Sequence, residues 1–158
     1  MTATRSEARS EVRDAAPASR AAVVIATRNR PDDLLRTVES LLTQTVLPGE
    51  LCIVDSSDFP ATRSRIEELC AAAGLALDYH HPAPRGLTIQ RNVGVRRTSG
   101  DPIFFLDDDI ALDPDCLEHV LAEYERWGPE LAGVRATPVR PARPSLATRM
   151  YRRIFGIG

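Results

Sequence analysis

Residues 103–109 read IFFLDDD, four apolar side chains followed without a break by three carboxylates. A short, continuous apolar run is typical of a strand covered on both faces, as in a parallel sheet between helices. Neighbouring carboxylates raise one another's pKa and resist ionisation unless a cation neutralises them. The stretch therefore predicts a buried strand that ends in a cation-binding turn. The alternative is a solvated acidic turn in which Asp113 or Asp115 caps the next helix.

Upstream of this strand, the chain alternates apolar runs with helical patterns. The runs AAVVIA and LCIV are again continuous and rich in β-branched side chains. Between them, Pro31 suits the first turn of a helix, and apolar residues follow it at three- and four-residue spacing. The predicted strands are 21–26, 51–54, 75–80, 102–106 and 131–134, and the predicted helices run from Pro31 to near Pro48, over 66–73, over 87–97 and from Pro114 to Tyr124.

This alternation predicts an α/β fold, with a mostly parallel sheet and helices on both faces. In such sheets, ligands bind beyond the carboxyl ends of the strands. Asp55 directly follows one predicted strand and Asp107–Asp109 follow another, so we expect these acids to face one crevice. Magnesium and manganese prefer oxygen ligands and are usually held by one or two carboxylates plus substrate phosphates. Asp107 and Asp109 are the predicted metal pair.

The composition excludes several classes of protein. All 20 basic residues are arginines, which rules out mechanisms that need a lysine nucleophile, a Schiff base or a phosphate-loop lysine. A phosphotransfer receiver domain is excluded with them, and no Gly-x-Gly-x-x-Gly follows the first strand, which disfavours a dinucleotide oxidoreductase. The formal net charge of -2, with interspersed signs, argues against a nucleic-acid partner. The three cysteines are predicted to be buried, reduced thiols.

Five short motifs occur in order between Val23 and Val139. They are VIATRNRP at 24–31, SLLTQT at 40–45, IVDSS at 53–57, RNVG at 91–94 with SGD at 99–101, and FLDDD at 105–109. Each motif is weak alone, but together and at this spacing they resemble the family 2 glycosyltransferases, which have the GT-A fold. The chain is similar to the N-terminal, nucleotide-sugar-binding part of that family.

The resemblance implies a metal-dependent, inverting enzyme that moves a sugar from a nucleotide-diphospho-sugar, first of all a UDP-sugar, to a glycan, lipid or small-molecule acceptor. Manganese or magnesium is the implied cofactor. The resemblance places Thr27 and Asp55 at the base or ribose, and Arg91 and Asn92 beside the diphosphate and sugar. Ser56 stands where many members have a second acid or an asparagine, which leaves base selectivity open. The implied nucleotide-sugar-binding residues are Thr27, Arg28, Asn29, Asp55, Ser56, Arg91, Asn92, Asp107 and Asp108.

The expected organisation is a flexible polar arm over 1–20, a GT-A half over 21–139, and a segment rich in arginine and proline over 140–158. That last segment is either a tail or the start of an acceptor-binding half. The family's catalytic base lies well beyond the metal motif, so it is expected beyond Gly158 and the fold is expected to be truncated. The alternative is a non-catalytic module that binds the nucleotide sugar.

No apolar stretch approaches the roughly 20 residues that a membrane-spanning helix needs. The chain is therefore expected to be soluble and cytoplasmic. The basic and aromatic segment 150–155 suits a peripheral contact with the inner face of the membrane.

Overall fold

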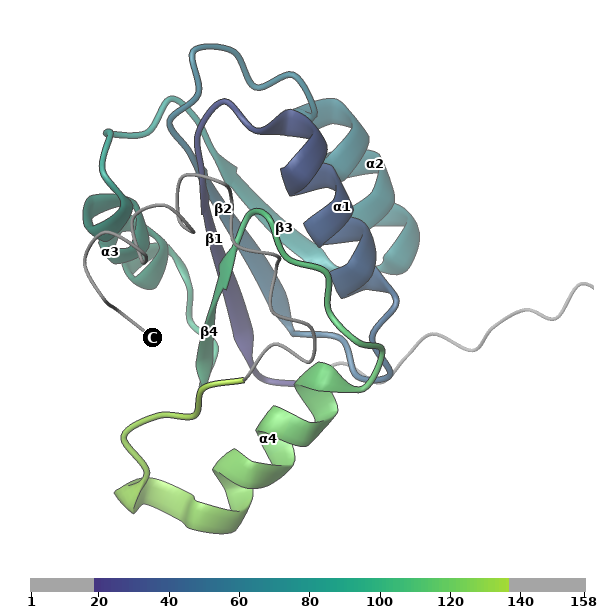
Figure 1. The fold of residues 1–158 in the computed structure, drawn as a ribbon, viewed down its shortest axis with the longest axis vertical. Coiled ribbons are helices and arrows are strands. Elements are labelled where there is room, and N and C mark those ends of the chain that lie inside the picture. The colour runs from purple at the N-terminus through teal and green to yellow at the C-terminus, as the bar shows by residue number, and fades with distance from the viewer. Residues whose placement is uncertain (1–18, 137–158) are drawn as a thin grey trace, which may run out of the picture.

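Four parallel strands lie side by side in the order β3-β2-β1-β4, and a helix follows each strand (Figure 1). The structure is a computed structural model that describes residues 19–136. The strands are β1 (Ala22–Thr27), β2 (Glu50–Asp55), β3 (Ala76–His80) and β4 (Ile103–Asp107). The helices are α1 (Pro31–Leu42), α2 (Arg63–Ala73), α3 (Leu87–Arg97) and α4 (Cys116–Trp127), followed by a 3-10 turn, Gly128–Glu130.

Helices cover both faces of the sheet, as the alternation of strands and helices predicts. Helices α1 and α2 lie on one face and α3 lies on the other, whereas α4 extends below the sheet (Figure 1). Leu117, at the start of α4, is buried in the same cluster as the core residues of α1. The predicted α/β fold with a parallel sheet is therefore confirmed.

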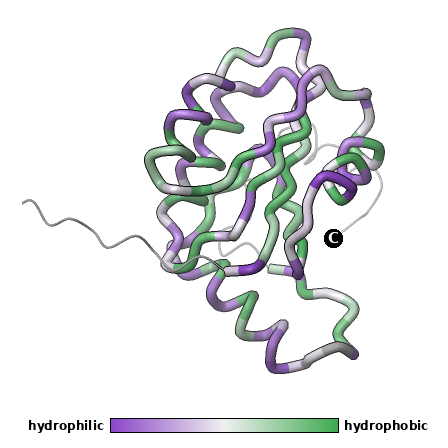
Figure 2. The backbone as a smooth tube through the Cα atoms, turned by 180° about the vertical axis from the view of Figure 1, so that it is seen from behind, coloured by the Kyte–Doolittle hydropathy of each residue, from purple (hydrophilic) through white to green (hydrophobic). Residues whose placement is uncertain are grey.

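The core divides into two layers because successive side chains of a strand point to opposite faces. Val23 and Ile25 belong to the cluster under α1 and α2, whereas Val24 belongs to the cluster under α3. Figure 2 shows the hydrophobic strands running through the middle of the molecule. Cys52 and Cys70 are buried free thiols, and burial raises the pKa of each to about 11. Cys116 is also a free thiol but is only half-buried, so the prediction of a buried position is wrong for this cysteine. Because both layers include residues of β1 and β2, these two central strands are covered on both faces.

Helix α3 lies almost directly on β1, and a glycine makes this possible. A β-carbon at Gly94 would lie 2.3 Å from Cγ1 of Val24 and 3.2 Å from its Cγ2. No side chain at this position fits without movement of the helix or the strand. The glycine of the RNVG motif is therefore required by the packing of α3 on the sheet.

The largest differences from the predicted elements are at one strand and at the end of one helix. Residues 131–134 form no strand, and Val134 is 40% exposed. A strand needs the backbone of a neighbour, and within residues 19–136 no strand pairs with this segment. Helix α1 ends at Leu42 and not near Pro48, because the amide of Thr45 leaves the helix and donates to the carbonyl of Pro114 at 2.7 Å.

Parts of the predicted organisation fall outside the described residues. These are most of the arm over 1–20, the segment 140–158, and with it the predicted membrane contact at 150–155. Within residues 19–136, no helix combines the length and the apolar character needed to cross a membrane.

Candidate nucleotide-sugar site

The carboxyl ends of β1, β2 and β4 meet at one edge of the sheet, the upper edge in Figure 1. The register of the strands aligns Thr27 of β1 with Asp55 of β2, and Ala26 of β1 with Asp107 of β4. The two groups of acids therefore lie on either side of the end of β1. This is the shared edge that the positions of the acids predict.

Asp108 is tied to the end of β1 by a buried hydrogen bond. Oγ1 of Thr27 donates to Oδ2 of Asp108 at 2.8 Å, and both residues are less than one-tenth exposed. The residue that follows the aspartate run (Asp107–Asp109) is also anchored, because Thr37 of α1 donates to the carbonyl of Ile110 at 2.7 Å. The run is therefore held between β1 and α1.

Two arginines face the aspartate run. Nη1 of Arg30 lies 3.3 Å from Oδ1 of Asp108 and 2.8 Å from Oδ2 of Asp109. Nη2 of Arg91 lies 2.9 Å from Oδ1 of Asp107, and its guanidinium lies over the ring of Phe105. The hydrogen bond with Asp109 and the charge of Asp108 raise the pKa of Arg30. Each carboxylate of the run thus has a cationic partner within the protein.

The aspartate run also has the donor atoms of a partial metal site. Among the described residues, no group of three or more histidine, cysteine or acidic side chains could hold a metal. Magnesium and manganese, however, are commonly held by one or two carboxylates with phosphates completing the shell. The side chains of Asp107 and Asp109 are 61% and 49% exposed, so their oxygens are accessible to a cation from solvent. Asp115 occupies the N-cap position of α4, but its side chain makes no hydrogen bond to the helix. The alternative that Asp115 caps this helix is therefore wrong.

Asp55 is buried and held on both oxygens. The amide of Ser57 donates to Oδ1 at 2.7 Å, and the hydroxyl of Tyr79 donates to Oδ2 at 2.7 Å. Burial, together with the hydrogen bond to Asp55, raises the pKa of Tyr79 well above its usual range. The neighbouring Ser56 is 4% exposed, and its Oγ is the one buried side-chain nitrogen or oxygen of the described residues that lacks a hydrogen-bond partner.

The remaining predicted residues lie on the surrounding loops and on α3. Asn29 has a left-handed backbone conformation with φ of 55°, and its backbone N–H donates to Oγ of Ser57 at 2.7 Å. This bond joins the loop after β1 to the loop after β2. Arg28 and Asn92 are exposed, and neither side chain makes a hydrogen bond to another described residue. The other predicted residues form two groups. One is the aspartate run with Thr27 and Arg91, and the other is Asp55 and Ser56 with Asn29.

Sequence reasoning missed three residues at this edge, Arg30, Tyr79 and Gln90. Gln90 is 4% exposed, and its Nε2 donates to the carbonyls of Thr27 at 2.9 Å and of Val54 at 2.8 Å. This amide joins the carboxyl ends of β1 and β2. The one feature of the sequence that could have indicated this role is the position of Gln90, a polar residue directly before the RNVG motif on a helix predicted to pack against the sheet.

We expect Gln90→Met to lower the free energy of unfolding by about 1–3 kcal/mol, because two buried carbonyls lose a donor. Urea denaturation of the variant and the parent chain measures this difference. Thr88→Ala is the matched control, since Thr88 is exposed on the same helix. Equal stability of the parent chain and Gln90→Met would show that the amide does not hold the strand ends together.

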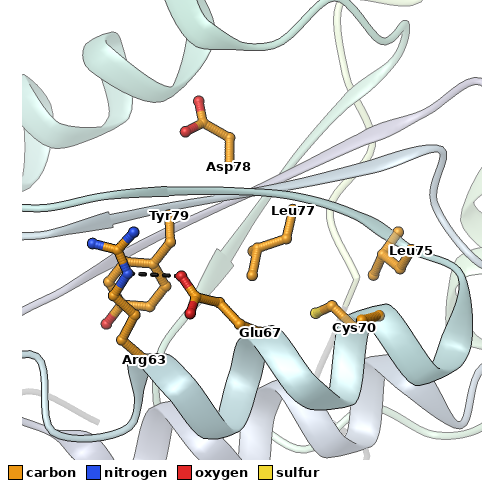
Figure 3. Close-up of a pocket in the computed structure, with 8 residues that line it drawn as sticks. Arg63, Glu67, Cys70, Leu75, Leu77, Asp78 and Tyr79 are labelled. Atoms are coloured by element: carbon orange, nitrogen blue, oxygen red, sulfur yellow. Dashed lines mark hydrogen bonds and ion pairs between the residues drawn. The ribbon is translucent and has the colours of Figure 1, made fainter.

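Two cavities lie apart from the aspartate run. One, of about 440 Å³, lies between α2 and β3 and is lined in part by Arg63, Glu67 and Tyr79 (Figure 3). The other, of about 520 Å³, lies at the opposite edge of the sheet beside Glu50. The carboxylate of Glu50 already has donors within the protein, because its Oε1 accepts from the backbone N–H groups of Ser99 and Gly100. The candidate site is therefore placed where the carboxyl ends of β1, β2 and β4 meet, and not at either cavity.

The comparison with known families agrees with this geometry. Residues 22–154 match the model of glycosyl transferase family 2. The chain belongs to this family. Among its relatives, the pre-mycofactocin glycosyltransferase of Mycobacterium tuberculosis is 33% identical over 105 residues. That match covers 65% of the chain but 20% of the mycobacterial protein, so the chain spans about a fifth of that relative.

Solved structures of glycosyltransferases share the fold of this family 2 chain. The mannosyltransferase PcManGT of Pyrobaculum calidifontis, solved with GDP-Man and Mn2+, has a TM-score of 0.56 at 21% identity, over 65% of the chain and 31% of that protein. S. aureus TarS 1-349, solved with UDP-GlcNAc, has a TM-score of 0.55 at 20% identity, over 67% of the chain and 31% of that protein. At this identity the similarity shows the fold alone, and the GT-A fold expected from the sequence is confirmed.

Proposed function

We propose that this chain forms the donor-binding half of a metal-dependent, inverting glycosyltransferase. The proposed donor is a nucleotide-diphospho-sugar, first of all a UDP-sugar, and the acceptor is a glycan, a lipid or a small molecule. The convergence of Thr27, Asp55 and the aspartate run at one sheet edge is the main support. The complexes of PcManGT with GDP-Man and Mn2+ and of TarS with UDP-GlcNAc support the same ligand class.

Each part of the edge has a proposed role in holding the donor. Asp107 and Asp109 hold manganese or magnesium, which when bound neutralises charge on the diphosphate leaving group. Arg91 offers charge-assisted hydrogen bonds to phosphate oxygens. Asp55 and Ser56 contact the nucleoside, and the Oγ of Ser56, which has no hydrogen-bond partner among the described residues, is available to bond to it. Thr27 keeps Asp108 in place from below.

The transfer breaks the bond between the anomeric carbon and the diphosphate oxygen while an acceptor hydroxyl forms the new bond. A general base must take the proton of that hydroxyl. The glutamates after the aspartate run lie on or just after α4, where Glu118 accepts from Thr45 at 2.7 Å and Glu123 accepts from Trp127 at 3.1 Å. We assign the base to none of them.

Calorimetric titration of the chain with UDP and GDP, in manganese and in chelator, tests the proposal. We expect saturable binding in manganese and binding at least about tenfold weaker in chelator, because the carboxylates repel the diphosphate without a cation. Uridine, which lacks phosphates, is the control ligand and should show little dependence on manganese. Equal affinity for UDP in both conditions would remove the metal from the proposed site. Release of nucleoside diphosphate that depends on an added acceptor would show that these residues include a general base.

A further inference from the structure

Arg30 has an anchored backbone and a long side chain directed at the aspartate run. It occupies the N-cap of α1, and its carbonyl accepts from the amide of Leu34 at 3.0 Å. The side chain is 51% exposed and leaves the helix start to reach residues 78 and 79 positions later in the sequence. The main chain of Arg30 is thus fixed, whereas its guanidinium is in contact with solvent.

The guanidinium is only partly used in this position. Nη1 alone bridges Asp108 and Asp109, and within residues 19–136 the Nε and Nη2 groups have no hydrogen-bond acceptor. An arginine side chain has five donors in a planar fork that matches phosphate oxygens. Most of the donors of Arg30 are therefore available to an anionic ligand at this edge.

The two carboxylates that Arg30 bridges differ in their other partners. The side chain of Asp108 is almost buried and is also bound by Thr27, so it keeps a partner if Arg30 leaves. Asp109 is 49% exposed, and within the described part of the chain its side chain is bonded to Arg30 alone. A divalent cation bound at Asp109 would lie close to the guanidinium of Arg30 and would repel it.

We propose that Arg30 is a movable countercharge, which bridges Asp108 and Asp109 until a divalent cation takes Asp109 and then binds the diphosphate of the donor. This inference rests on the proposed function, since it assumes that metal and diphosphate meet at the aspartate run. It predicts effects of opposite sign when Arg30 is removed. The cation loses a competitor and binds more tightly, whereas the diphosphate loses a partner and binds more weakly.

The test uses Arg30→Gln in two titrations. The first follows Mn²⁺ alone by the loss of its free electron paramagnetic resonance signal, and the second follows UDP by calorimetry at saturating Mn²⁺. We expect Mn²⁺ to bind several-fold more tightly to the variant, and UDP to bind about 10–100-fold more weakly, the range for a lost charged hydrogen bond. Arg36→Gln is the control, because Arg36 is an exposed arginine of α1 that pairs with Asp33. The control should change neither affinity.

Arg30→Lys provides a second variant that keeps the positive charge. It should bind Mn²⁺ as the parent chain does, and UDP more weakly, because an ammonium cannot present the planar fork. Thermal unfolding confirms that each variant is folded. Unchanged or weaker Mn²⁺ binding by folded Arg30→Gln would overturn the inference while leaving the proposed function intact. Failure of the parent chain to bind UDP at any Mn²⁺ concentration would instead overturn both.

Discussion

Asp109→Asn is expected to abolish most of the manganese-dependent affinity for a nucleoside diphosphate. The substitution keeps the shape of the side chain but removes one of the two exposed carboxylates proposed to hold the cation. Loss of a residue that only supports a metal ligand typically costs 10–100-fold in metal affinity, so loss of a ligand should cost at least about 100-fold. Calorimetric titration of UDP at fixed manganese measures the effect.

A neighbouring aspartate supplies the control for this experiment. Asp113→Asn removes the same charge from the same loop, but the side chain of Asp113 is exposed and makes no hydrogen bond to another described residue. We expect its UDP affinity to stay within about twofold of the parent chain, since an exposed charge that does not contact the ligand is screened by solvent and salt. A similar loss in both variants would mean that the overall charge of the loop matters, and not a metal bound at Asp109.

Gly94→Val is expected to prevent the chain from folding, or to lower its free energy of unfolding by well over the roughly 1–3 kcal/mol typical of an overpacked core. Its β-carbon alone would lie 2.3 Å from Cγ1 of Val24, which is itself buried in the central strand. Gly94→Ala should cost less, because alanine also gains about 1 kcal/mol of helix propensity over glycine. Urea denaturation followed by circular dichroism measures both variants.

Two further variants separate steric overlap from a general effect of losing glycine. Gly133→Ala should leave stability nearly unchanged, because nothing lies within 4 Å of a β-carbon built there. Shortening the facing side chain should restore part of the loss, so Gly94→Ala combined with Val24→Ala should cost less than the sum of the two single changes. Additive losses in that pair would contradict the proposed contact between α3 and β1.

Periodicity along the chain was sufficient to predict the four strands and the helix that follows each of them. The reason is that a buried strand and an amphipathic helix each require their own spacing of apolar residues, whatever they pack against. The same pattern predicted a parallel sheet, and with it the shared edge that holds Asp55 and the aspartate run. The residues 131–134 have an equally apolar pattern and form no strand, because strand formation also depends on a partner backbone.

The partners of individual side chains were decided by the tertiary structure alone. Arg30 and Asp109 are far apart in the sequence, and they meet because the loops after β1 and β4 leave adjacent strands at the same edge. The bonds of Gln90 and Tyr79 to this edge arise in the same way, through α3 on one face and the edge strand β3 beside β2. Local spacing records how a residue relates to its own helix or strand, but a hydrogen bond between two such elements depends on how they pack in three dimensions.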